Sequence, residues 1–287
     1  MKTDFPNITI LGGGLLGGSL ALALAALENP PQVRLWARKQ ETVDEATKLG
    51  IGNATADLAL AVKDADLLIL AVPVGSMAPL MLSALETGLP ASCLITDVGS
   101  VKRVPHHQIS PLLKGRSNAF IGSHPMAGSE RNGLAAATAT LFKNAACLLT
   151  NDNGATAEQT AALERFWKMI GCRVSWMSAA VHDELVARIS HLPHLIAASA
   201  ARVCLKDPSE GRFGGGGLRD TTRVAAGNPT MWAEIVTENR EALIGPLRET
   251  IADLREILAS LESGNQEQAR QWLNTAKQRR LPLNSII

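Results

Sequence analysis

The stretch Gly12-Gly13-Gly14-Leu15-Leu16-Gly17-Gly18-Ser19 decides the fold of this chain. It follows Asn7–Leu11, a short apolar run with β-branched residues, and it precedes the Ala/Leu-rich segment Leu20–Leu27. This order predicts a strand, a glycine-rich turn and a helix.

Gly12, Gly14 and Gly17 match the pattern GxGxxG in the context that it requires. In such a turn the three glycines allow a tight bend, close approach of the backbone to a pyrophosphate and close helix–strand packing, with the anion at the helix N-terminus. We therefore predict a dinucleotide site, to which Leu15 and Leu16 at the helix start also contribute.

Further strand-like runs alternate with helical segments through the first 177 residues. They are Gln32–Ala37, Ala65–Val72, Ser92–Val98, Ala119–Ser123, Ala145–Thr150 and Cys172–Met177. This alternation predicts an α/β domain over residues 1–177, with a Rossmann-like, doubly wound and mostly parallel sheet.

The end of the second predicted strand indicates which dinucleotide binds. NAD sites carry an acid there for the ribose 2′-hydroxyl, whereas NADP sites offer a basic group to the 2′-phosphate. This chain has Ala37, then Arg38 and Lys39. We predict a preference for NADP, with Arg38 as the main phosphate contact and Lys39 or Gln40 as a secondary one. NAD remains possible, since Glu41 could supply the acid.

Two other strand ends reach the edge at which open parallel sheets bind ligands. Val72 and Pro73 follow one apolar strand, and Asp97-Val98-Gly99-Ser100 follows the next. We expect Ser100 to reach the nicotinamide end of the cofactor, although its hydroxyl could instead cap a helix at Val101–Leu113. Lys102 and Arg103 are expected in solvent.

A candidate base lies in the stretch Gly-Ser-His-Pro-Met-Ala-Gly-Ser-Glu at 122–130. It places His124 directly after an apolar strand, where Pro125 fixes the backbone. An imidazole can remove a proton at physiological pH because its pKa is near neutral. The alternative is an ordinary histidine in a surface turn.

The composition favours a small-molecule ligand. The chain has 28 Lys+Arg against 27 Asp+Glu and 3% aromatic residues, which argues against nucleic acid and an anionic membrane as partners. The start shows no leader pattern, and no apolar stretch is long enough to span a bilayer. Cys93, Cys147, Cys172 and Cys204 are isolated in apolar surroundings. We expect buried free thiols and a cytoplasmic protein.

After Met177 the pattern becomes helical, so residues 178–287 are predicted to form an all-helical dimerisation domain. Val181–Leu205 and the segment from Trp232 to Leu261 carry apolar residues three and four apart. The second segment, with a kink expected at Pro246, is too long for its own domain to cover. A homodimer seam is the natural use, and intrachain packing is the alternative.

The segment between these helices contains four consecutive glycines, Gly214–Gly217, and then Arg219, Asp220 and Arg223. Arginine suits a carboxylate through two parallel hydrogen bonds, so one of the two, oriented by Asp220, could hold an acidic substrate. A surface ion pair is the alternative. His191 and His194 are three residues apart around a proline, with no acidic third ligand nearby, so no metal site is predicted.

Taken together, these motifs resemble the prephenate and arogenate dehydrogenases of tyrosine biosynthesis. The resemblance covers nearly the whole chain and runs through GGGLLGGSLA, DVGSVK at 97–102, HPMAGSE at 124–130, SHLPH at 190–194, GLRDTTR at 217–223 and GNP at 227–229. It implies an oxidoreductase with a dinucleotide-binding domain followed by a helical dimerisation domain.

The resemblance also implies roles for individual residues. His124 matches the catalytic histidine, and Ser100 the serine that hydrogen-bonds near it and the nicotinamide. Arg223 matches the arginine that holds the ring carboxylate, and His194 a histidine on the substrate side. The remaining matches are Ser129 and Glu130, which contact the side chain or gate the site, and His191 and Asp220, which support it.

The implied function is oxidative decarboxylation of prephenate to 4-hydroxyphenylpyruvate, with arogenate as the alternative substrate. Two further possibilities stay open: a different NADP-dependent oxidoreductase, such as a 3-hydroxyacid dehydrogenase, and a non-catalytic NADP sensor. The short segments outside these motifs suggest no appended mutase or regulatory domain, so feedback by tyrosine would act at the active site.

Overall fold

Strands in the first part of the chain form one continuous sheet. The structure, a computed structural model, describes residues 3–128 and 132–285. Within these residues the sheet has eight strands in the order β3-β2-β1-β4-β5-β6-β7-β8. Their bounds are β1 Asn7–Leu11, β2 Gln32–Trp36, β3 Ala54–Thr55, β4 Leu67–Leu70, β5 Leu94–Asp97, β6 Ala119–Pro125, β7 Ala146–Thr150 and β8 Arg173–Met177.

The strand directions confirm the predicted Rossmann-like, mostly parallel sheet. Strands β1 to β6 pair with one another in parallel, whereas β7 is antiparallel to β6 and pairs in parallel with β8. β1 lies between β2 and β4, so the order of strands reverses there. In open α/β sheets such a reversal creates a crevice at the carboxyl ends of the strands. The glycine turn follows β1 at this crevice.

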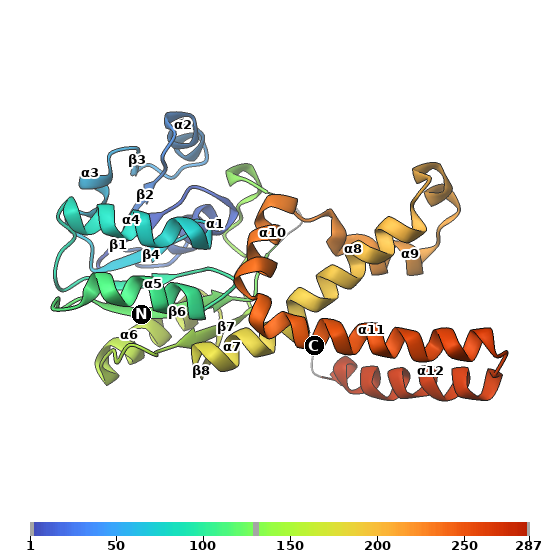
Figure 1. The fold of residues 1–287 in the computed structure, drawn as a ribbon. Helices are drawn as coiled ribbons and strands as arrows, with labels where there is room; N and C mark the ends of the chain where they lie inside the picture. Colours follow the sequence, from blue (N-terminus) through green and yellow to red (C-terminus); the bar gives the residue numbers. More distant parts are fainter. Residues whose placement is uncertain (1–2, 129–131, 286–287) are drawn as a thin grey trace. The chain divides into compact units, whose positions relative to one another are not determined.

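Helices cover both faces of the sheet (Figure 1). Within β4, Leu67 and Ile69 belong to one hydrophobic core with α1 (Leu15–Ala25) and α6 (Ala157–Met169). Leu68 and Leu70 belong to a second core with α4 (Val74–Glu86) and α5 (Arg103–Leu113). Because successive side chains of a strand point to opposite faces, a run of four apolar residues fills both cores.

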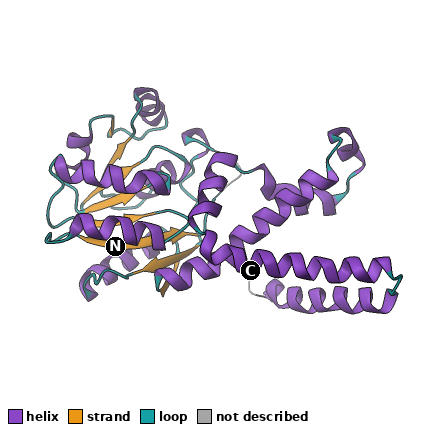
Figure 2. Cartoon of the chain, viewed as in Figure 1, coloured by secondary structure: helices purple, strands orange, loops and turns teal. Residues whose placement is uncertain are grey.

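Residues 178–285 contain only helical and irregular structure (Figure 2). The remaining helices are α2 Gln40–Lys48, α3 Leu58–Val62, α7 Ala179–Val186, α8 Leu192–Cys204, α9 Gly216–Thr222, α10 Pro229–Glu238, α11 Arg240–Glu262 and α12 Gln266–Arg280. No helix in the described part of the chain is both long and apolar enough to cross a membrane.

The chain divides into two compact units, Met1–Asn239 and Arg240–Ile287. The prediction of one long helix from Trp232 to Leu261 is wrong, because the structure divides this segment at Asn239 into α10 and α11. The side-chain amide of Asn239 is buried in hydrogen bonds within the first unit. Pro246 lies inside α11.

The second unit pairs α11 with α12. Gly264 has a φ of +66° in the turn between them, a conformation that favours glycine. Large apolar side chains along α11 remain exposed in the single chain: Ile244, Ile251, Leu254, Leu258 and Leu261.

Lys102 does not lie in solvent as the sequence suggested. Its side chain is fully buried, and its Nζ donates to the carboxylate of Asp97, which is also fully buried. Helix α5 begins at Arg103, so Ser100 is not its N-cap. Cys204 is also exposed rather than buried.

The buried ion pair is expected to be needed for folding. Lys102→Met leaves the Asp97 charge uncompensated in the core, which should lower the free energy of unfolding by about 3–5 kcal/mol in urea denaturation. The control, Arg103→Met, removes a surface pair with Glu184 and should cost less than about 1 kcal/mol. Equal losses in the two variants would contradict the expected difference.

Candidate active site

A cavity of about 580 Å³ lies at the carboxyl ends of the central strands, within the first unit. Its walls come from loops after β1, β4, β5 and β6, and from helical residues further along the chain. The walls include Gly14–Leu16, Ala71–Val74, Val98–Ser100, His124–Gly128, Asn132, Gly133, Ser190, His191, Arg223, Val224, Gly227, Met231, Trp232, Glu234 and Ile235.

The three motif glycines are required for different physical reasons. A Cβ at Gly12, whose φ is +130°, would lie 2.2 Å from the main-chain oxygen of Ala71. A Cβ at Gly17 would lie 1.9 Å from the main-chain oxygen of Gly12. A Cβ at Gly14 would meet no atom of the described residues within 4 Å, and Gly14 lines the cavity.

The geometry of the glycine turn fits a bound dinucleotide. Gly12 and Gly17 allow the protein to pack against itself, whereas Gly14 leaves its backbone bare toward the cavity. Helix α1 begins at Leu15, after Gly14 as its N-cap, and has no acidic residue in its first turn. A pyrophosphate could therefore approach the main-chain amides at the positive end of the helix.

The predicted cofactor residues divide into two groups in the structure. Ser100, Val72 and Pro73 line the same cavity as the glycine turn. Arg38 and Lys39 are exposed just beyond β2 and are not part of the cavity wall.

Of the predicted substrate residues, the structure brings Arg223 and His191 into the cavity with His124. His194 is mostly buried outside the cavity wall and stacks on Trp232, with 3.5 Å between ring centroids. Asp220 is exposed and lies 4.0 Å from Arg219. Ser129 and Glu130 lie outside the described residues.

A chain of hydrogen bonds leads from His124 to a buried carboxylate. The Nδ1 atom of His124 lies 2.9 Å from Nε2 of His182. The Nδ1 atom of His182 lies 2.7 Å from Oδ1 of Asp183. All three side chains are at least nine-tenths buried.

The carboxylate sets the proton positions on both rings. An ionised Asp183 can only accept, so Nδ1 of His182 carries the proton, and Nε2 of the neutral ring accepts from Nδ1 of His124. Nε2 of His124 is then the ring atom with a lone pair. His124 lines the cavity in the state that a general base requires.

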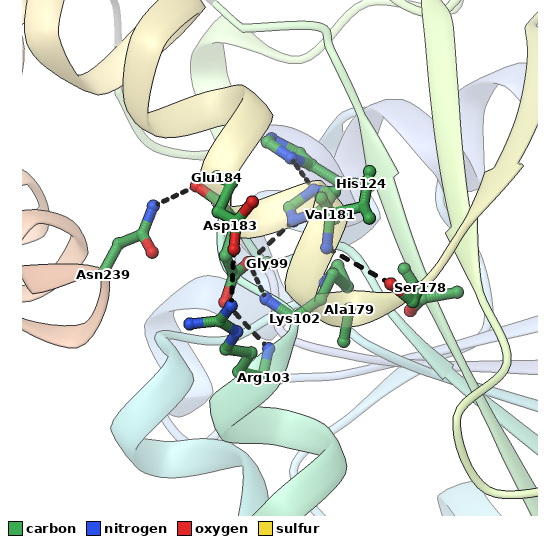
Figure 3. A network of polar contacts seen from close by, with 12 residues as sticks. Gly99, Lys102, Arg103, His124, Ser178, Ala179, Val181, Asp183, Glu184 and Asn239 are labelled. Atoms are coloured by element: carbon green, nitrogen blue, oxygen red, sulfur yellow. Dashed lines mark hydrogen bonds and ion pairs between the residues drawn. The ribbon is translucent and has the colours of Figure 1, made fainter. Parts of the chain in front are cut away.

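Asp183 also anchors the loop that carries Ser100. Its Oδ1 accepts the main-chain amide of Lys102 at 2.7 Å, and its Oδ2 accepts that of Arg103 at 3.0 Å (Figure 3). Burial raises the pKa of Asp183, but the hydrogen bonds from His182 and these two amides outweigh it and lower the pKa overall.

Burial also keeps His124 neutral. Removal from water lowers the pKa of its imidazole well below the usual value, and the nearby His182, Lys102 and His191 lower it further. The ring is therefore unprotonated, and able to accept a proton, at neutral pH.

Comparison with known proteins places the chain in a family. Residues 20–176 match the family described as "Prephenate dehydrogenase, nucleotide-binding domain", and residues 178–275 match "Prephenate dehydrogenase, dimerization domain". The chain belongs to the prephenate dehydrogenase family. The predicted family, and with it a nicotinamide-dinucleotide-dependent oxidoreductase, is confirmed.

Alignments with two named relatives cover almost the whole chain. It is 34% identical to a cyclohexadienyl dehydrogenase of Zymomonas mobilis, over 99% of this chain and 98% of the relative. It is also 34% identical to a prephenate dehydrogenase of Bacillus subtilis, over 96% of this chain and 76% of that protein.

Solved structures of the family have the same fold. The prephenate dehydrogenase of Aquifex aeolicus, in complex with hydroxyphenyl propionate and NAD+, is 26% identical with a TM-score of 0.87, covering 96% of this chain and 98% of that one. An arogenate dehydrogenase of Synechocystis is 29% identical with a TM-score of 0.79, covering 96% and 99%.

Sequence reasoning missed His182 and Asp183. Their neighbourhood in the sequence is an ordinary helix start at Ala179, and the contacts of Asp183 with Lys102 and Arg103 span about eighty positions. The available signal was a histidine beside an acid in the helix that follows the last strand of this prephenate dehydrogenase domain.

The glycines provide a matched test of the dinucleotide site. Gly17→Ala should destabilise the fold by about 1–3 kcal/mol, because its Cβ meets backbone. Gly14→Ala should keep its melting temperature, because Gly14 has an ordinary φ of −94°, but should weaken binding of the reduced dinucleotide by about tenfold or more in fluorescence titration. Unchanged affinity in Gly14→Ala would exclude close approach at this position.

The buried histidines should make the protein sensitive to acid. Burial lowers the pKa of five rings, and that of His191 falls to about 4. Below the usual value near 6.5 the unfolded chain binds protons that the folded chain does not, so stability falls as the pH is lowered from about 7 to about 5. The five rings are those of His106, His124, His182, His191 and His194.

Urea denaturation at several pH values measures this effect, and His191→Gln should flatten the slope by removing one contributor. A free energy of unfolding that does not change over this range would contradict the expectation.

Proposed function

We propose that this enzyme oxidises and decarboxylates prephenate to 4-hydroxyphenylpyruvate, with NADP as the hydride acceptor. The observation that carries the proposal is the neutral His124, whose Nε2 lone pair belongs to a ring in the wall of the cavity that also contains the glycine turn. Membership of the prephenate dehydrogenase family supports the same substrate.

The chemistry assigns a proton transfer to His124. Its Nε2 accepts the proton of the hydroxyl on C4 of the prephenate ring, while the hydrogen on the same carbon leaves with its electron pair. The bound dinucleotide supplies the acceptor for that hydride. Loss of the ring carboxylate as CO2 returns electrons to the ring, and the resulting phenolate oxygen takes the proton back from His124. Ser100 lies on the cavity wall after β5 and is proposed to hydrogen-bond the reacting hydroxyl.

Arg223 is proposed to position the ring carboxylate. Its guanidinium can form two parallel hydrogen bonds with a carboxylate, and the residue lies at the exposed edge of the cavity. Partial exposure weakens the ion pair. This suits a group that must leave as neutral CO2, because tight binding of the charged carboxylate would oppose its loss.

The preference for NADP rests on the end of β2. Ala37 is buried where an NAD site would carry an acid, and a Cβ at Gly13 would lie 3.2 Å from the Ala37 Cβ. The next two side chains, Arg38 and Lys39, are exposed and cationic, as a 2′-phosphate requires.

The enzyme is also proposed to form a homodimer through its helical region, which matches the family's dimerization domain. The apolar side chains along α11 support this proposal, since Leu254, Leu258 and Leu261 are each more than half exposed in one chain. Burial of such a row against a second copy would stabilise the association.

Reduction of NADP and NAD by the purified enzyme tests the reaction, with prephenate, arogenate and 3-hydroxy acids as substrates. We expect turnover with prephenate and a higher kcat/KM for NADP than for NAD. Similarity to an arogenate dehydrogenase makes arogenate the second candidate. Turnover with 3-hydroxy acids alone, or with no substrate, would overturn the proposal, and a clear preference for NAD would overturn the role of Arg38.

Two variants separate the proposed base from the proposed anchor. His124→Asn should lower kcat by about 100-fold or more with little change in KM, whereas Arg223→Ala should chiefly raise KM. His107, an exposed histidine on α5, provides the control, and His107→Asn should behave as wild type. An unchanged kcat in His124→Asn would refute the base.

A further inference from the structure

His191 occupies an unusual place in the helical region. It is the last residue of a π-helical turn, Ala187–His191, that separates α7 from α8. Such wide turns are rare in proteins, and those that occur are often found at functional sites. The His191 side chain is completely buried from solvent, and the residue forms part of the cavity wall.

The partners of Asn239 fix the proton position on this ring. The Asn239 Nδ2 atom lies 2.8 Å from the main-chain oxygen of Asp183, an oxygen that can only accept, so this atom is the amide nitrogen. The same Nδ2 lies 3.0 Å from Nδ1 of His191. An amide nitrogen has no lone pair to offer, so Nδ1 of His191 accepts, and the proton of the neutral ring is on Nε2.

The Nε2–H group of His191 has no hydrogen-bond partner among the described residues, although it is buried. Burial lowers the pKa of the ring to about 4, so it is neutral at physiological pH. A buried donor without a partner is costly and rare in proteins, and a ligand in the cavity could satisfy it.

We propose that His191 is a substrate-binding residue that donates its Nε2–H to an oxygen of the bound substrate. The inference rests on the proposed function, because prephenate offers two carboxylates and a keto oxygen as acceptors. His191 and His124 are then neutral rings with opposite roles at Nε2, since His124 presents a lone pair and accepts a proton there. An ammonium group could not take the place of the oxygen at His191, because it has no lone pair.

Steady-state kinetics of two variants test the contact. His191→Leu fills similar space without a donor, and should raise KM for prephenate by about 10- to 100-fold with a smaller change in kcat. His191→Gln places an amide N–H near the position of Nε2 and should restore KM to within about threefold of wild type. Equal KM values in wild type and a folded His191→Leu would overturn the proposal.

Nuclear magnetic resonance of the wild-type protein tests it independently of any variant's folding. In the full chain labelled with 15N-histidine, two-bond proton–nitrogen correlations distinguish the tautomers, and His191 is identified by the signal missing in His191→Gln. We expect protonated Nε2 and unprotonated Nδ1 at neutral pH. A ring protonated at Nδ1, or at both nitrogens, would overturn the proposal.

Addition of prephenate with the reduced dinucleotide, which cannot accept hydride, should shift the His191 Nε2 resonance. No shift at saturation would count against the contact. The two proposals fail differently, since absence of wild-type turnover refutes the proposed reaction, whereas turnover with the wrong tautomer refutes only the role of His191.

Discussion

The buried carboxylate of Asp183 holds the site together. It accepts three N–H groups: the main-chain amides of Lys102 and Arg103, and Nδ1 of His182. A buried charge is costly unless hydrogen bonds compensate it, so these donors and the carboxylate depend on one another. Through them the helix after β8 is joined to the loop after β5, and the two histidines beyond Asp183 acquire defined tautomers.

A second buried acid, Asp97, secures the same loop from the sheet side. It accepts the main-chain amides of Gly99 and Ser123 and the ammonium of Lys102. Lys102 therefore meets one acid through its backbone and the other through its side chain. The segment that carries Ser100 is held on both sides, and the strand that carries His124 is tied to it through Ser123.

Local sequence patterns were sufficient to predict most of the fold and part of the candidate site. The apolar run Leu67–Leu70 and the glycine turn each reflect a rule that operates over a few residues, and both appear as predicted. The burial of Lys102 and the role of Asp183 could not be predicted in this way, because they depend on partners whose position only the tertiary fold determines. The broken helix at Asn239 has the same origin, since its amide bonds to residues about fifty positions away.

The relay from Asp183 also resolves a conflict in the demands on His124. Burial keeps the ring neutral at rest, but in the proposed reaction the same burial opposes the positive charge that forms when the ring accepts a proton. Asp97 and Lys102 neutralise one another, so the net negative charge near the site is that of Asp183. The imidazole of His182 separates this carboxylate from His124. The attraction of the carboxylate increases as His124 becomes charged and is small while the ring is neutral. In the proposed reaction this attraction favours the proton-transfer state over the resting state, which is the condition for faster chemistry.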